Sequence, residues 1–68
     1  MKWKEIAEKY DSSYPEMARI LGLDRSYLRK IDEGTAAEPK YMYATKCLMA
    51  LYLAIRQTIP SYRRNENQ

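Results

Sequence analysis

The sequence has no histidine and a single cysteine, Cys47, among its 68 residues. One cysteine excludes a disulfide within the chain, and one thiolate without histidine cannot supply the four ligands of a structural zinc ion. The chain therefore lacks two supports on which small domains commonly rely. Helix packing and self-association remain as sources of stability, and on this ground we expect a homodimer.

Other absences bear on location and activity. No run approaches the roughly 18 apolar residues needed to span a bilayer, and the charged first residues lead into no apolar signal segment. We therefore expect a cytoplasmic protein, in which a lone cysteine stays reduced. The sequence also has no glycine-rich phosphate loop and no paired nucleophile and base, so we expect no catalytic residues, no metal and no cofactor.

Charge is distributed in blocks, although the net charge is only +3. Residues 1–24 carry four cations and five anions, whereas residues 25–30 carry three cations and no anion. Three acidic residues follow, and residues 40–64 then add five cations. A short, purely basic block fits a contact with nucleic acid, but a solvated helix face is the simpler interpretation of charge alone.

The spacing of apolar residues predicts a first helix over residues 2–9, with a stripe that begins at the core residue Trp3. Ser13 and Glu16 have the spacing of a capping box, so a second helix is expected to begin there. Gly22 ends that helix, because glycine readily adopts the left-handed conformation common after a last turn. The first two helices are therefore short.

A third helix is predicted over residues 25–33, with Asp24 as its N-cap and Gly34 after its last turn. It follows the second helix at the spacing of a helix-turn-helix, which requires a small residue where the helices cross and glycine in the turn. Ala18 and Gly22 occupy those positions. Five apolar residues are expected to lock the two helices together: Met17, Leu21, Leu23, Leu28 and Ile31.

Residues 14–34, with Pro39 and the helix after it, resemble the helix-turn-helix region of the Cro/C1-type, or lambda-repressor-like, regulators. The likeness covers about residues 6–55 and includes the apolar-x-x-apolar-acid-x-glycine ending at residues 28–34. It implies an all-α fold of four to five helices that binds double-stranded DNA. The family often has glutamine where Tyr14 stands, and often has two shorter helices in place of the long last helix.

The resemblance implies that Arg25, Ser26 and Arg29 face base edges, with Lys30 near the groove wall. On the predicted helix these side chains lie opposite the apolar side, and arginine can bridge the two acceptors of guanine. An ordinary solvated helix face is the alternative. Phosphate contacts are expected from three further residues: Tyr14, Tyr27 and Lys40. For the two tyrosines, a half-buried ring that closes the core is an equal alternative.

The last helix is predicted from residue 40 to 57 or 58, between Pro39 and Pro60. One apolar stripe is expected to pack on the other helices: Tyr41, Ala44, Leu48, Leu51 and Ile55. Further apolar residues lie off this stripe and need a cover that so short a chain cannot provide. We assign them to a homodimer interface: Met42, Met49, Tyr52 and Leu53. Cys47 is interpreted as a small core residue.

Residues 1–60 are thus predicted to form the DNA-binding domain, and residues 61–68 a flexible polar tail. The hypothesis is a sequence-specific transcription regulator, a dimeric repressor of the phage or mobile-element type. Its two recognition helices would lie about 34 Å apart and read a palindromic operator. The alternative is a small helical protein-interaction module, antitoxin-like or an adaptor, that uses the apolar last helix.

Overall fold

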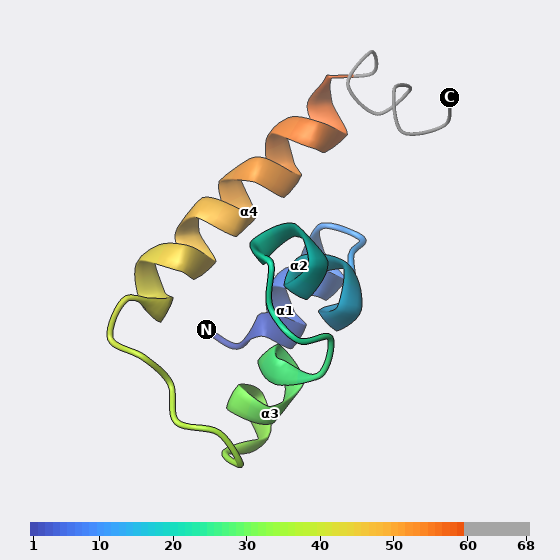
Figure 1. The fold of residues 1–68 in the computed structure, drawn as a ribbon. Helices are drawn as coiled ribbons and strands as arrows, with labels where there is room; N and C mark the ends of the chain where they lie inside the picture. The colour runs from blue at the N-terminus through green and yellow to red at the C-terminus, as the bar shows by residue number, and fades with distance from the viewer. Residues whose placement is uncertain (60–68) are drawn as a thin grey trace.

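A computed structural model describes residues 1–59, and this part of the chain forms four helices and no strand. The helices are α1 (Trp3–Lys9), α2 (Tyr14–Leu21), α3 (Tyr27–Glu33) and α4 (Met42–Thr58). The first three pack on one another, and α4 runs along one side of this group, where it contacts α1 (Figure 1). The predicted all-α class is confirmed. The predicted tail at residues 61–68 lies outside the described residues.

The ends of α2 follow the local signals of the sequence. The Ser13 Oγ accepts a hydrogen bond from the backbone N–H of Glu16 at 3.2 Å. Gly22 adopts the left-handed conformation with a φ of 74°, which a side chain would strain. The N–H of Leu23 then donates to the carbonyl of Ala18 at 2.8 Å, and this bond closes the last turn. Both predicted boundaries of α2 are therefore confirmed.

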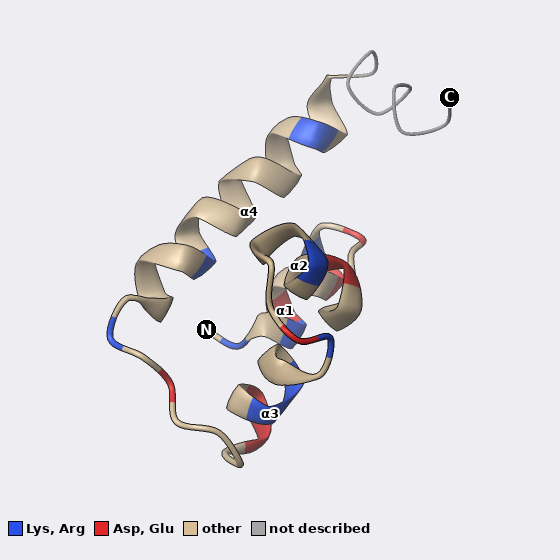
Figure 2. Cartoon of the chain, in the orientation of Figure 1, with Lys and Arg blue, Asp and Glu red and all other residues tan. Residues whose placement is uncertain are grey.

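The third helix begins two residues later than predicted. The Asp24 carboxylate accepts hydrogen bonds from the N–H and the hydroxyl of Ser26, at 3.1 and 2.7 Å. Aspartate commonly bonds the backbone two residues on in this way, and this arrangement forms a turn instead of a helical first turn. Arg25 and Ser26 consequently lie in the turn between α2 and α3, where acidic and basic residues adjoin (Figure 2).

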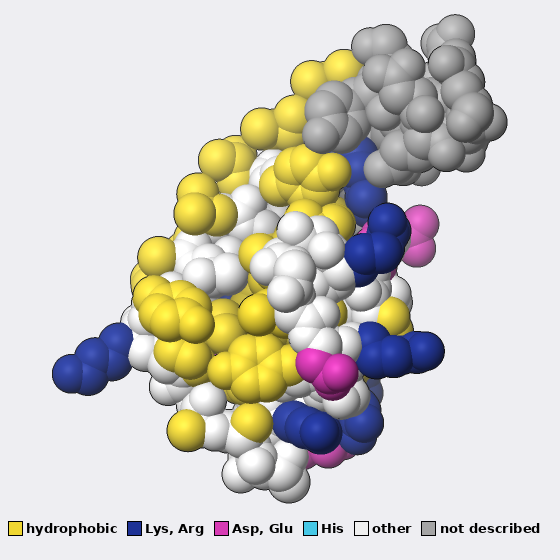
Figure 3. Space-filling model, viewed as in Figure 1, with side chains coloured by type: hydrophobic (Ala, Val, Ile, Leu, Met, Phe, Trp, Pro, Cys, Tyr) yellow, Lys and Arg dark blue, Asp and Glu magenta, His cyan; other side chains and the backbone are white. Residues whose placement is uncertain are grey.

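The face of α4 that packs on the core is the opposite of the predicted one. Met42, Met49 and Leu53 were expected at a dimer interface, yet each is at most 3% exposed within one chain. Tyr52 is half-buried against the same core. The stripe that was expected to pack inward faces solvent: Tyr41, Ala44, Leu48, Leu51 and Ile55. Cys47 is also exposed, so its assignment to the core is wrong. Figure 3 shows hydrophobic side chains gathered along the outer side of α4.

Two buried cations on the inner face of α4 find partners in this orientation. The Nζ of Lys46 donates to Glu38 at 2.5 Å and to the carbonyl of Met1 at 2.7 Å. One end of α4 is thereby fixed, and near its other end Arg56 pairs with Glu16 at 3.3 Å. The aliphatic stems of both cations join the core while their charged heads reach a partner. Because an unpaired buried charge costs several kcal/mol, the two carboxylates offset much of the cost of burying these cations on the inner face.

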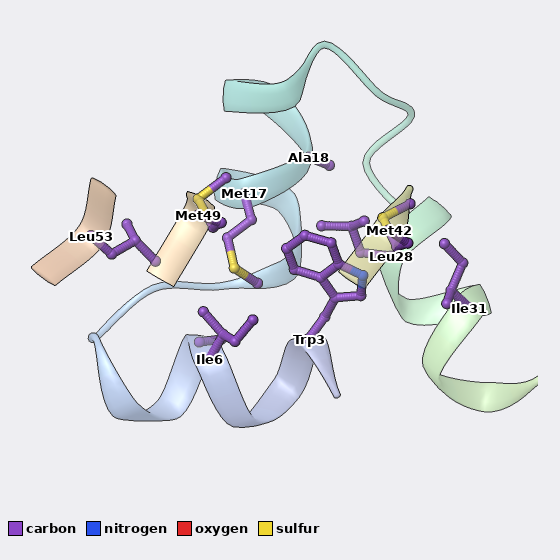
Figure 4. Packing of buried hydrophobic residues seen from close by; sticks show 10 residues of the cluster. Trp3, Ile6, Met17, Ala18, Leu28, Ile31, Met42, Met49 and Leu53 are labelled. Carbon is purple, nitrogen blue, oxygen red and sulfur yellow. The ribbon is translucent and has the colours of Figure 1, made fainter. Parts of the chain in front are cut away.

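The core gathers around the indole of Trp3, which is completely buried. Figure 4 shows the Trp3 ring in the middle of the cluster, with Leu28 and Met42 beside it. Every helix contributes to this cluster, whose buried members are Trp3, Ile6, Ala7, Met17, Ala18, Leu28, Ile31, Met42, Met49 and Leu53. Of the five residues predicted to join α2 to α3, three belong to the cluster and two pack against it half-buried. The predicted contact between the two helices is therefore confirmed.

Within residues 1–59, the helices are too short or too polar for any of them to traverse a lipid bilayer.

Candidate nucleic-acid interface

The basic block of residues 25–30 lies along the turn before α3 and the first half of that helix. Arg25, Arg29 and Lys30 are all exposed, whereas Leu28 between them is fully buried. The three cations therefore stand on the outer side of a segment whose inner side is fixed in the core. Several basic side chains in Figure 3 lie over the α2 and α3 side of the molecule, away from the hydrophobic side chains of α4.

Asp24 is an exposed acid near two of these cations. Its pKa is lowered, chiefly by the hydrogen bonds from Ser26 and further by the positive charges of Lys30 and Arg25. Both cations are thus close enough to act on one exposed carboxylate. The hydroxyl of Ser26 donates its hydrogen bond to Asp24. While that bond is kept, Ser26 can act only as an acceptor toward a DNA base.

Arg29 forms an ion pair with Glu33, one turn further along α3. The Nη1 of Arg29 lies 3.3 Å from the Glu33 carboxylate, and the side chains are 49% and 52% exposed. Such an exposed pair contributes about 0.3–0.5 kcal/mol, because water and salt screen it. Arg29 can consequently leave Glu33 for a stronger acceptor at little cost.

Tyr14 has a partner within the chain. Its hydroxyl donates to the Asp32 carboxylate at 2.9 Å, and its ring packs half-buried against the core. The proton that was expected to reach a phosphate is therefore used between α2 and α3, and a phosphate contact by Tyr14 stays a prediction that requires this bond to be exchanged. The half-buried ring, the alternative for this residue, is the observed one.

Asp32 is a structural residue that the sequence analysis did not assign. Besides the Tyr14 hydroxyl, its carboxylate accepts the backbone N–H groups of Trp3 and Lys4, at 3.0 and 2.9 Å. These are among the first N–H groups of α1, which have no partner inside that helix. Asp32 lies four residues after the buried Leu28, a spacing that places it on the inner face of α3 and could have identified it.

The bond between Tyr14 and Asp32 predicts a stability change at high pH. Burial, followed by this hydrogen bond, raises the pKa of Tyr14 from 10.0 to about 12. The fold thus favours the neutral phenol, and this contribution is complete below about pH 10 and lost as the pH rises through about 12. We expect denaturant unfolding to show a steeper loss of stability in this window for the wild type than for Tyr14→Phe. Ionisation of every tyrosine near pH 10, measured by tyrosinate absorbance, would contradict this.

The two other residues expected at phosphates lie in different surroundings. Tyr27 is the first residue of α3, and its ring packs half-buried against the core, as its alternative interpretation held. Lys40 is exposed in the loop that precedes α4. The basic position of that loop lies beside the start of α4, apart from the basic positions of α3 (Figure 2). Lys40 therefore does not share the surface formed by Arg25, Arg29 and Lys30.

Comparisons with known proteins returned no matching family model, no matching curated protein and no matching solved structure. Among residues 1–59, no group of acidic or cysteine side chains is arranged to hold a metal ion. The exposed cations of the turn and of α3 form the candidate interface.

Proposed function

We propose that the chain is a sequence-specific regulator that binds double-stranded DNA through a lambda-repressor-like fold. In this proposal α2 and α3 form the helix-turn-helix, and α3 enters the major groove with the preceding turn. The observation that carries it is the exposure of Arg25, Arg29 and Lys30 on one surface, on a segment that Leu28 anchors in the core. A surface held in this way is rigid enough to read bases.

The chemistry of this surface favours recognition of guanine. Arg25 and Arg29 are four residues apart, and each guanidinium can donate two hydrogen bonds to the O6 and N7 of a guanine. Lys30 adds a point charge for the groove wall. Asp24 and Glu33 lie near these cations and offset part of their positive charge, which reduces the attraction to the DNA backbone here. Binding therefore depends on the geometry of the arginine contacts more than on bulk charge.

Selection from a random duplex pool tests the proposal. We expect bound sequences to be enriched in guanine at fixed positions, and their affinity to fall with rising salt because bound cations are released from the DNA. A scrambled duplex of equal composition serves as the control. If selected and scrambled duplexes bind equally, or if neither binds at low salt, the proposal is wrong and the interaction-module hypothesis gains support.

A further inference from the structure

We propose that a second copy of this chain covers the outer face of α4, so that the protein is a dimer through that helix. The surface consists of Ala44, Cys47, Leu48, Leu51 and Ile55, which we call the outer stripe. It lies on the side of α4 opposite to the interface expected from the sequence. Of that expected interface, Met42, Met49 and Leu53 are buried inside one chain and Tyr52 is half-buried. The inference goes beyond the proposed function and does not depend on DNA binding.

The outer stripe is apolar and without charge. Leu48 is 67% exposed and Leu51 is 57% exposed, which is a large apolar area for a helix in water. The 17 residues of α4 include two charged side chains, Lys46 and Arg56, and both are buried on the inner face. A helix side exposed to solvent ordinarily carries charged or polar residues. The absence of charge from the outer stripe of α4 indicates that this side of the helix is covered.

The spacing of the stripe favours another copy of the same helix as the cover. Within the stripe, Ala44, Leu48, Leu51 and Ile55 follow at intervals of four, three and four residues, which is the spacing of a seam between two packed helices. A seam of this kind is self-complementary about a two-fold axis, and it needs no complementary charge on a different protein.

The outer stripe continues into further exposed apolar residues, so a paired helix covers more than the stripe alone. Leu48, Leu51 and Ile55 together offer on the order of 300 Å², and the exposed Tyr41, Tyr43 and Ile59 adjoin them and bring the apolar area nearer to the about 800 Å² per partner of a standard interface. The basic surface of α3 lies on another side of the molecule and stays free in such a dimer (Figure 3). A dimer would therefore carry two basic surfaces related by symmetry, as a palindromic site requires.

The oligomeric state tests this inference without DNA. Sedimentation equilibrium or light scattering at tens of micromolar should give a mass twice the 8.1 kDa of one chain. Because both copies change at once, the variant Leu48→Glu/Leu51→Glu should weaken association by about 100-fold or more and give a monomer. The variant should keep its helical circular dichroism, since both side chains lie outside the core. Gln57→Glu, which adds charge to α4 outside the stripe, should remain a dimer.

The thiol of Cys47 supplies a second measurement on the unmodified protein. Because Cys47 belongs to the stripe, its reaction with Ellman's reagent should slow several-fold at protein concentrations where the dimer predominates. A wild type that is monomeric at these concentrations overturns the inference. So does a Leu48→Glu/Leu51→Glu variant that remains a dimer, because association then uses another surface. Loss of DNA binding alone leaves the mass unchanged and bears on the proposed function only.

Discussion

The double variant Arg25→Ala/Arg29→Ala is expected to lose DNA binding by about 100-fold or more while it keeps its fold. Each guanidinium that contacts a guanine contributes about 1–3 kcal/mol of discrimination, and the variant removes two of them. Stability should change by less than about 0.5 kcal/mol, because both arginines are exposed and the pair between Arg29 and Glu33 is screened by solvent. Fluorescence anisotropy with a selected duplex measures the loss.

A matched control separates base contacts from bulk charge. The variant Lys9→Glu lowers the net charge from +3 to +1, as the double variant does, but it alters α1 instead of the basic surface. We expect Lys9→Glu to retain most of the affinity. Equal losses in the two variants would mean that long-range attraction, and not contact by Arg25 and Arg29, accounts for binding.

Asp32→Ala is expected to cause the largest loss of stability, about 2–4 kcal/mol in the free energy of unfolding. The Asp32 carboxylate accepts three hydrogen bonds, which cap α1 and join α3 to Tyr14 in α2. Removing it leaves these donors without a charged acceptor. A chain of this length is stable by only about 3–10 kcal/mol, so the loss is a large part of the total. Urea unfolding followed by circular dichroism gives the value.

The neighbouring acid serves as a control for Asp32. Glu33 is 52% exposed and pairs only with Arg29, so Glu33→Ala should change stability by less than about 0.5 kcal/mol. Asp32→Asn should lie between the two, because an amide oxygen keeps the geometry of an acceptor and lacks the charge. If Asp32→Ala is as stable as Glu33→Ala, the three bonds do not hold the helices together.

The sequence predicts elements of this fold well where the signals are local. The boundaries of α2 are set by Ser13 and Gly22, and each acts on backbone groups within four residues. The start of α3 was misjudged although its signal is local, because Asp24 can cap a helix or close a turn and the sequence does not distinguish them. Its hydrogen bonds to Ser26 select the turn.

The orientation of α4 could not be read from periodicity. Both sides of the helix are apolar, so the pattern offers two inward faces of similar hydrophobicity. The observed inner face also carries Lys46 and Arg56, whose partners Glu38 and Glu16 lie 8 and 40 residues away in the sequence. Charged residues are ordinarily placed outside, and this rule fails where a carboxylate at the edge of the core is in reach of the cation. The error in the dimer interface follows from this one cause.

The candidate site was predictable only where it depends on local features of the sequence. The exposure of Arg29 and Lys30 follows from their position opposite the apolar side of α3, which is a local property, and Arg25 is exposed in the turn before that helix. The partner of the Tyr14 hydroxyl is Asp32, 18 residues later, and only the packing of α2 against α3 brings the two together. Long-range contacts of this kind decide which polar groups are used inside the fold and which stay available to a ligand.

The most direct test of the account maps the DNA contact onto the protein. We propose to titrate the ¹⁵N-labelled chain with its selected duplex and to measure the NMR chemical shift of each backbone amide at every step. The account predicts that signals of residues 24–30 shift most, with the side-chain resonances of Arg29 among them, while those of the outer stripe of α4 stay in place. Shifts confined to α4, or none at DNA concentrations that saturate binding, would contradict the claim that the turn and α3 read DNA.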